Sequence, residues 1–205
     1  MKYDEFKAKV KNVPVINIEL LKLLFAYSQQ FKNQMSRWQK NGKILKLRKN
    51  LYILSNEDRR INPSRLFISH EIYNPSYVSM EYALSFYDLI PEKVTDITCI
   101  TTKKTTTFEN ILGKFIYQHI KIDCFAGFLE FKDEVGLTYY MATPEKAVVD
   151  FLYFNQYRFN IDYKKTLHES FRFQNTKILD TKRLQEYVKI FKDKKLKRII
   201  QEVKK

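Results

Sequence analysis

Side chains that could contact nucleic acid are concentrated between Asn33 and Asn50, in the neighbouring segments "FKNQMSRWQKNG" and "NGKILKLRKNLYIL". Arginine, lysine, asparagine and serine donate hydrogen bonds to phosphate oxygens or base edges, and neither segment contains an acidic residue. These residue types therefore indicate DNA recognition. The candidate contact residues are Asn33, Ser36, Arg37, Lys40, Lys43, Lys46, Arg48, Lys49 and Asn50.

A helix must position the first of these residues. Phe31, Met35 and Trp38 recur at i, i+4 and i+7, and Gly42 stands where a left-handed residue ends a helix. At about 100° per residue, the polar candidates up to Lys40 fall on the side opposite this apolar stripe. A solvated helix face without a ligand is the alternative interpretation of the same residues.

A β-hairpin must position the others. Apolar residues in 44–47 and 51–53 predict two short strands joined at Arg48, Lys49 and Asn50. Asn50 can adopt the positive φ that a tight turn requires. Arg48 and Lys49 at the tip would gain from the phosphate charge and from counterion release, and Lys43 and Lys46 would line the same side.

The order of elements predicts the N-terminal fold. A short helix over residues 4–11 precedes a helix that begins after Asn17 as its N-cap, and a connection near Ser28 leads to the contact helix. Two helices and a hairpin within about 40 residues form a winged helix-turn-helix, in which the second helix enters the major groove and the hairpin contacts the backbone or minor groove. We therefore expect residues 1–60 to be a winged helix-turn-helix DNA-binding domain.

Charge is distributed unevenly along the 205 residues, whose formal net charge is +14. Residues 1–60 contain 14 Lys or Arg against 5 Asp or Glu, residues 61–160 contain 9 against 12, and residues 161–205 contain 14 against 6. Strongly basic segments most often contact nucleic acid. The two basic ends around an acidic middle favour a separate N-terminal module.

Residues 61–205 are predicted to form an α/β domain, so that the whole chain is α+β. Helices are expected in "SRLFISHEI" and in the segment that follows Ser79, with Ser79 as the cap. A mostly antiparallel sheet is expected from four segments with alternating apolar residues, which are "VTDITCITT", "GKFIYQHIKI", "FAGFLEFKD" and "GLTYYMAT". The segment "KKTTTFENIL" is expected to be a polar connection between the first two strands. Thr143 and Pro144 open a further helix. Asp150 lies among its apolar residues, where a buried structural carboxylate is favoured over a catalytic one.

Residues 161–205 are predicted to be helical and basic, with Thr181 as a cap and an apolar stripe from Leu184 to Val203. The opposite side is rich in Lys and Arg. Such a face could contact a second stretch of DNA, an acidic protein surface or a membrane, and a solvated face on a packed helix is the simpler interpretation.

Four segments in this order resemble the AbiEi-type antitoxins, the transcription-regulator half of abortive-infection toxin-antitoxin operons. They are "NGKILKLRKNLYIL", "ISHEIYNPSYVSMEYALSFYDLIPE", "GKFIYQHI" and "ATPEKAVVDFLYF", within roughly residues 15–155. The resemblance implies a winged helix-turn-helix that binds inverted repeats in the operon's promoter, and a second domain that counters a nucleotidyltransferase-like toxin. Whether that domain contacts the toxin directly stays open.

Carried over to this chain, the family's basic wing falls on Lys46, Arg48 and Lys49, and its "PE(K/R)A..D" run falls on residues 144–150. One departure is that Lys49-Asn50 stands where the family usually has Arg-Gly before the tyrosine of the wing. Because Asn tolerates the same turn conformation, this difference weakens the resemblance only slightly.

No constellation of an enzyme, metal or cofactor site is recognised in the sequence. The three histidines are scattered, and neither a catalytic motif nor a glycine-rich phosphate loop occurs. Cys99 and Cys124 have no metal-ligand spacing and are expected in the core. No apolar run approaches the roughly 20 residues of a membrane span, so a cytoplasmic protein is expected. The alternatives to an antitoxin are a protein-interaction module or a stand-alone winged-helix regulator.

Overall fold

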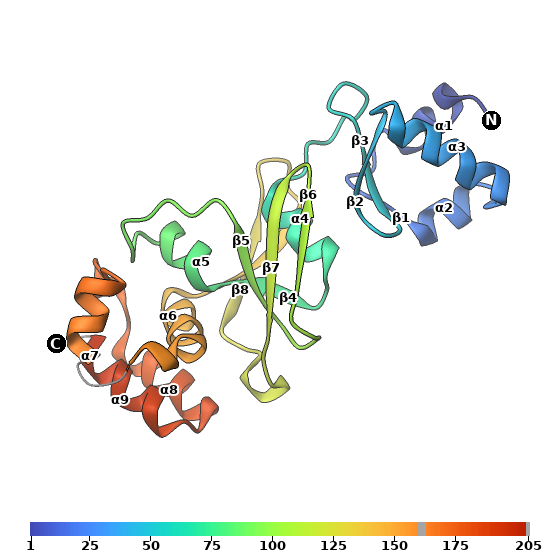
Figure 1. The fold of residues 1–205 in the computed structure, drawn as a ribbon. Coiled ribbons are helices and arrows are strands. Elements are labelled where there is room, and N and C mark those ends of the chain that lie inside the picture. The colour runs from blue at the N-terminus through green and yellow to red at the C-terminus, as the bar shows by residue number, and fades with distance from the viewer. Residues whose placement is uncertain (160–162, 204–205) are drawn as a thin grey trace.

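The computed structural model describes residues 1–159 and 163–203, and it shows an α+β protein with two sheets (Figure 1). The smaller sheet and three helices lie at the N-terminal end of the molecule, the larger sheet lies in the middle, and the C-terminal helices lie at the other end. The elements at the N-terminal end are α1 (Tyr3–Val10), β1 (Ile16–Asn17), α2 (Ile18–Leu24), α3 (Gln29–Lys40), β2 (Ile44–Arg48) and β3 (Leu51–Leu54).

Local chemistry explains where these helices begin and end. The Asn17 side chain accepts a hydrogen bond from the Leu20 backbone N–H, and the Ser28 hydroxyl accepts one from Phe31, so each caps its helix as the sequence predicts. Gly42 follows α3 with a φ of 69°, a conformation that glycine adopts without steric cost. The chain then turns directly into the hairpin.

The three-stranded sheet has the order β1-β3-β2 with antiparallel pairing, and both of its faces are covered. Ile44 and Leu54 face the N-terminal helices, in one apolar cluster with Phe6 and Trp38. Leu47, Leu51 and Ile53 point the other way, into the core of the larger part of the molecule. Because successive side chains of a strand alternate between faces, one short hairpin contributes to two cores.

The larger part is built on a six-stranded sheet in the order β6-β7-β5-β4-β9-β8. The pairs β6–β7, β4–β5 and β8–β9 are antiparallel, whereas β5–β7 and β4–β9 are parallel. The sheet is therefore mixed, and the prediction of a mostly antiparallel sheet is only partly met. Its strands are β4 (Ser76–Val78), β5 (Ile97–Thr101), β6 (Thr106–Asn110), β7 (Gly113–His119), β8 (Phe128–Lys132) and β9 (Thr138–Ala142).

The strand β6 corrects the prediction of a polar connection. It lies in "KKTTTFENIL" and pairs with β7 at the edge of the sheet. Its residues alternate between half-buried and exposed, and threonine, glutamate and asparagine occupy positions that an interior strand would give to apolar residues. An edge strand of this kind resembles a loop in composition.

The helices of the larger part are α4 (Arg65–Ile72), α5 (Met80–Phe86), α6 (Pro144–Phe154), α7 (Tyr163–Lys165), α8 (Thr181–Phe191) and α9 (Lys194–Val203), and short turns of 3-10 helix (Ile122–Cys124, Gln156–Arg158, Thr176–Ile178) and of π-helix (Thr166–Ser170) lie between some of them. Helices α4, α5 and α6 pack on the large sheet, and the C-terminal helices α8 and α9 pack on α6. Thr143 caps α6, as predicted. Ser79 is the N-cap residue of α5, as predicted, but its hydroxyl makes no capping hydrogen bond and instead donates to Asp150. Asp180 rather than Thr181 is the N-cap of α8, so that predicted cap is wrong.

The C-terminal stripe agrees with its prediction. Leu184 and Val188 of α8 and Leu196, Ile199, Ile200 and Val203 of α9 are all buried. Residues 171–175 are not helical, so the predicted helical segment is interrupted. The predicted helical residues 161, 162, 204 and 205 lie outside the described part of the chain.

Candidate nucleic-acid interface

The outward face of α3 carries the first four candidate contact residues. Asn33, Ser36, Arg37 and Lys40 are all exposed, whereas Phe31, Met35 and Trp38 are buried, so the two sides of the helix lie as the sequence predicts. The Ser36 hydroxyl donates to the Lys32 carbonyl at 3.1 Å. The Asn33 side-chain oxygen accepts from the Gln29 amide at 3.1 Å, and its amide nitrogen is left to donate elsewhere.

A cluster of aromatic rings holds α3 in place from behind. The rings of Phe6 and Trp38 lie 4.8 Å apart, and those of Phe25 and Phe31 lie 5.2 Å apart and are stacked. Rings at these separations attract one another beyond the area that they bury. The polar face of α3 is thus presented on a rigid base made from α1, the residue after α2, and α3 itself.

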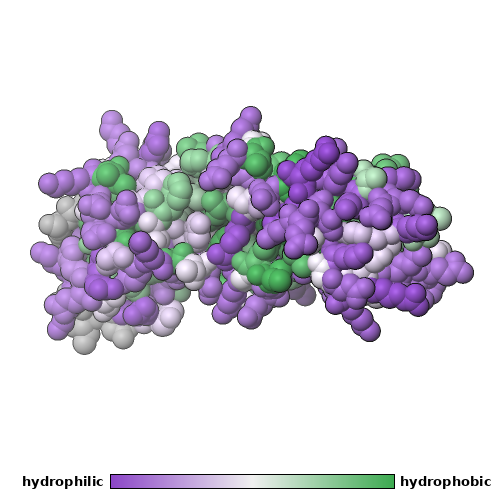
Figure 2. Space-filling view, turned by 90° about the horizontal axis from the view of Figure 1, so that it is seen from above, coloured by the Kyte–Doolittle hydropathy of each residue, from purple (hydrophilic) through white to green (hydrophobic). Residues whose placement is uncertain are grey.

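Four cations near this face are free of carboxylate partners. In the described part of the chain, Arg37, Lys40, Lys46 and Lys49 form no ion pair. All four are exposed. In the view from above, hydrophilic side chains cover much of the N-terminal end of the molecule (Figure 2). An unpaired, solvated ammonium or guanidinium group can bind a phosphate without first losing an internal partner.

The backbone at the tip of the hairpin forms the tight turn that the sequence predicts. Asn50 adopts a φ of 64°, and the strand register shifts between Lys46 and Arg48, so that Arg48 pairs with Leu51. One extra residue in a strand next to a left-handed residue is a common way to close a hairpin. Lys49 is exposed at this turn.

The side chains of Arg48 and Lys49 are placed differently, although the sequence predicts both as phosphate contacts at the hairpin tip. Its side chain is half-buried, and one guanidinium nitrogen, Nη1, donates to the Lys49 carbonyl at 3.0 Å. Its Nε is buried and has no hydrogen-bond partner among the described residues. The guanidinium is therefore partly taken up by the backbone of the turn itself. Lys49 is the better placed of the two for a phosphate.

Lys43 lies at the base of the hairpin, away from its tip. The ammonium nitrogen is 4.3 Å from the centroid of the Tyr3 ring, a cation–π contact. The Tyr3 hydroxyl donates to the Asp58 carboxylate at 2.7 Å and also lies 3.1 Å from the Lys43 carbonyl. The hydrogen bond from Tyr3 is the main cause that lowers the pKa of Asp58. Lys43 thus also ties α1 to the start of β2.

The hairpin is fixed to the larger sheet as well as to α3. The side-chain amide of Asn110 donates to the Leu47 carbonyl at 3.1 Å, and Asn110 ends β6. Leu47 itself is buried in the larger core. This second attachment was not foreseen, because the alternation of apolar residues in a strand does not reveal what covers each face.

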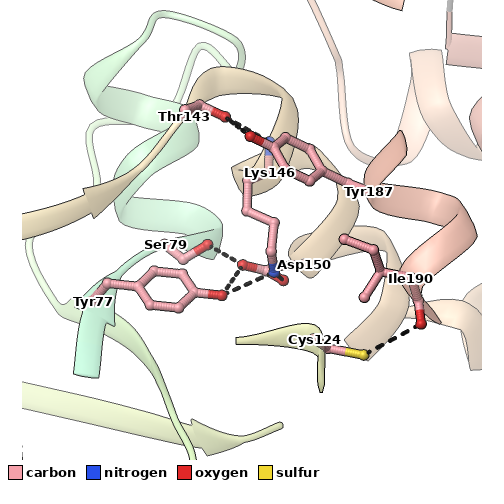
Figure 3. A network of polar contacts seen from close by, with 8 residues as sticks. All are labelled: Tyr77, Ser79, Cys124, Thr143, Lys146, Asp150, Tyr187 and Ile190. Carbon is pink, nitrogen blue, oxygen red and sulfur yellow. Dashed lines mark hydrogen bonds and ion pairs between the residues drawn. The ribbon is translucent and has the colours of Figure 1, made fainter. Parts of the chain in front are cut away.

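A polar network at the centre of the larger part is closed to solvent (Figure 3). The Asp150 carboxylate accepts from the Tyr77 hydroxyl at 3.0 Å and from the Ser79 hydroxyl at 2.8 Å, and it is paired with the Lys146 ammonium. Lys146 also donates to the Tyr77 hydroxyl at 2.8 Å. The side chains of Lys146 and Asp150 are 1% and 0% exposed.

Asp150 is buried and hydrogen-bonded, as predicted. Burial raises the pKa of the Asp150 carboxyl, while Lys146, Ser79 and Tyr77 oppose that rise. The four residues join β4 to α6, and all four are buried. The burial of Lys146 was not foreseen, although its i, i+4 spacing from Asp150 on a helix is the signal that could have indicated the pair.

Both cysteines are buried, as predicted, and they are free thiols. No group of three or more metal-ligating side chains is found within residues 1–159 and 163–203. Among these residues, no helix has the length and apolar character that a bilayer crossing requires.

In comparisons with known proteins, no family model and no curated sequence matches this chain. Its function is therefore inferred from the side chains and their placement.

Proposed function

We propose that the chain is a DNA-binding transcriptional regulator and that residues 1–60 are a winged helix-turn-helix. In this proposal α3 enters the major groove of double-stranded DNA, and the β2–β3 hairpin is the wing that lies along the neighbouring backbone. The observation that carries the proposal is the exposed face of α3, which is polar and cationic throughout, beside a hairpin that exposes Lys46 and Lys49.

The proposed contacts divide into two kinds. Arg37 and Asn33 on α3 can donate to base edges and so contribute sequence preference. Lys46 and Lys49 on the hairpin offer point charges to phosphates, which fix the position of the protein and give affinity for any sequence. Arg48, which is half-buried and donates to the Lys49 carbonyl, has a smaller part in this scheme than the sequence suggests.

The resemblance to AbiEi-type antitoxins supports a narrower form of the proposal. The chain would repress its own operon by binding inverted repeats in the promoter, and it would counter a nucleotidyltransferase-like toxin from the adjacent gene. We assign it no reaction of its own. The antitoxin half of the proposal depends on the resemblance alone, whereas the DNA-binding half also depends on the surface of α3.

A binding measurement with the duplex upstream of the chain's own gene tests the DNA-binding half. Arg37→Ala should reduce the preference for that duplex over a scrambled one, by about 1–3 kcal/mol if the guanidinium binds a guanine edge. Lys121→Ala is the matched control, because it also removes one exposed cation. Lys121 follows the C-terminal end of β7, which is the end far from the hairpin. An undiminished preference in Arg37→Ala, or an equal loss in the control, contradicts the proposed role of α3.

Coexpression with the product of the neighbouring gene tests the antitoxin half. The full chain is required, since removing residues 1–60 would uncover the apolar side chains that Leu47, Leu51 and Ile53 now cover. The wild type should restore growth if that product is toxic. If Arg37→Ala has lost the preference for the promoter but still restores growth, protection from the toxin does not depend on repression. If the wild-type chain does not restore growth, it is not an antitoxin of that gene product.

A further inference from the structure

Helices α8 and α9 form a groove at the end of the molecule opposite the candidate nucleic-acid interface (Figure 1). The cavity has a volume of about 560 Å³. Among its lining residues, Leu184 and Val188 from α8 and Ile200 from α9 are buried and form its floor, whereas the lysines are exposed. The groove is thus apolar at its base and cationic at its rim.

The inner side of α8 is anchored, which leaves the groove on the outer side. The Glu145 carboxylate accepts from the Asp180 backbone N–H at 2.9 Å, where α8 begins. The Cys124 thiol lies 3.9 Å from the Ile190 carbonyl, and the Tyr187 hydroxyl is 3.5 Å from that of Thr143 (Figure 3). These contacts hold α8 against the larger part of the molecule.

The charges at the rim have no internal partners. Within the described residues, no ion pair or hydrogen bond of the ammonium groups of Lys189, Lys192, Lys194 and Lys197 is found. Asp193 also lines the groove, but its two oxygens already accept from Leu196 and Gln156. A ligand with several negative charges would therefore meet four free cations and a single carboxylate.

We propose that this groove binds an acidic amphipathic helix of a protein partner. An apolar stripe on such a helix would cover the floor, since a third helix packs its side-chain ridges into the furrow between two others. Glutamates or aspartates flanking the stripe would meet the lysines on either side. This second binding surface is independent of the proposed DNA contact, and it gives the basic C-terminal helices a protein ligand.

The chemistry of the groove disfavours the other classes of ligand. Single-stranded nucleic acid binds by stacking its bases on aromatic side chains, and none lines the groove. Duplex DNA would leave the apolar floor unfilled. A membrane surface requires apolar side chains that project outward, whereas Leu184, Val188 and Ile200 are buried.

Fluorescence anisotropy with a designed peptide tests the proposal on the full chain in the absence of DNA. The probe is a labelled amphipathic peptide of about 15 residues, long enough for about four helical turns, with leucines at i, i+3, i+4 and i+7 and glutamates elsewhere. A second peptide replaces every glutamate with lysine. We expect saturable binding of the acidic peptide and none of the basic one.

Charge reversal identifies the surface that the peptide uses. The double variant Lys189→Glu/Lys197→Glu, with one change on each helix of the groove, should bind the acidic peptide at least about tenfold more weakly. The double variant Arg183→Glu/Arg198→Glu also changes one exposed residue on each helix, but neither residue lines the groove, so it should bind like the wild type. Circular dichroism checks that both variants are folded.

Three results would overturn the proposal. One is the absence of saturable binding to the wild type. Another is an equal loss in both double variants, which would indicate general attraction to a basic surface. The last is that the wild type binds dodecanoate in the groove but does not bind the acidic peptide, which would assign the groove to small amphipathic anions. None of these results bears on the proposed DNA contact, because no DNA is present.

Discussion

At the scale of single residues, Lys146 and Asp150 show how the core tolerates charge. The two groups are buried together, and Tyr77 and Ser79 supply further hydrogen bonds to the carboxylate. A buried pair is costly to break, because the remaining charge loses its partner without regaining water. The network therefore holds β4 and α6 together only while both members of the pair are present.

Asp150→Asn tests this interdependence. The change leaves the Lys146 ammonium buried without a negative partner, so we expect the free energy of unfolding to fall by about 3–5 kcal/mol. Chemical denaturation in urea measures it. Glu130→Gln, an exposed carboxylate on β8, is the control and should change stability by less than about 0.5 kcal/mol. If Asp150→Asn behaves like this control, the pair does not stabilise the fold.

Arg48 and Lys49 show the limit of predicting a contact residue by its type. The sequence places both at the tip of a hairpin, and the turn itself is as expected, with Asn50 at positive φ. Which of two adjacent cations faces solvent depends on the register shift between Lys46 and Arg48 and on the packing of Leu47. Neither can be deduced from residue types in one short segment.

At the scale of elements, the β2–β3 hairpin is the connection between the two apolar cores. Its Ile44 and Leu54 belong to the N-terminal cluster, and its Leu47, Leu51 and Ile53 belong to the larger one. A hairpin buried on both faces cannot separate from either part without exposing apolar surface. We therefore expect the N-terminal helices and the large sheet to unfold together.

Trp38 makes this expectation measurable, because it is the single tryptophan and lies in the N-terminal cluster. Its fluorescence should change at the same urea concentration as the far-ultraviolet circular dichroism of the whole chain. Leu51→Ala should lower the free energy of unfolding by about 2–5 kcal/mol. It should also move the fluorescence transition to a lower urea concentration than the circular dichroism transition. Leu23→Ala, on a side chain that is 80% exposed, is the control. Two separate transitions in the wild type would contradict the coupling.

Several elements could be predicted because their signals are local. The caps at Asn17, Ser28 and Thr143 and the stripe of Phe31, Met35 and Trp38 each depend on a few neighbouring residues. The parallel pairing of β5 with β7 could not be predicted, because it depends on which strands meet in space. The same limit applies to β6, whose polar residues are tolerated only because it lies at an edge.

At the scale of the whole molecule, positive charge is collected at the two ends and the middle is slightly acidic. The structure places these ends apart, with the large sheet between them (Figure 1). We propose two separate binding surfaces, the α3 face with its hairpin for DNA and the α8–α9 groove for an acidic helix. A net charge of +14 would also attract DNA without any specific surface, so the central claim requires a test of position.

The salt dependence of DNA binding provides that test. Each phosphate contact contributes about 0.9 to the slope of the logarithm of the binding constant against the logarithm of the salt concentration. Lys49→Ala should reduce this slope by about 1 and weaken binding to the upstream and scrambled duplexes alike. The slope of Lys121→Ala should equal that of the wild type. Equal slopes for the wild type and Lys49→Ala would contradict the assignment of the hairpin as a DNA contact.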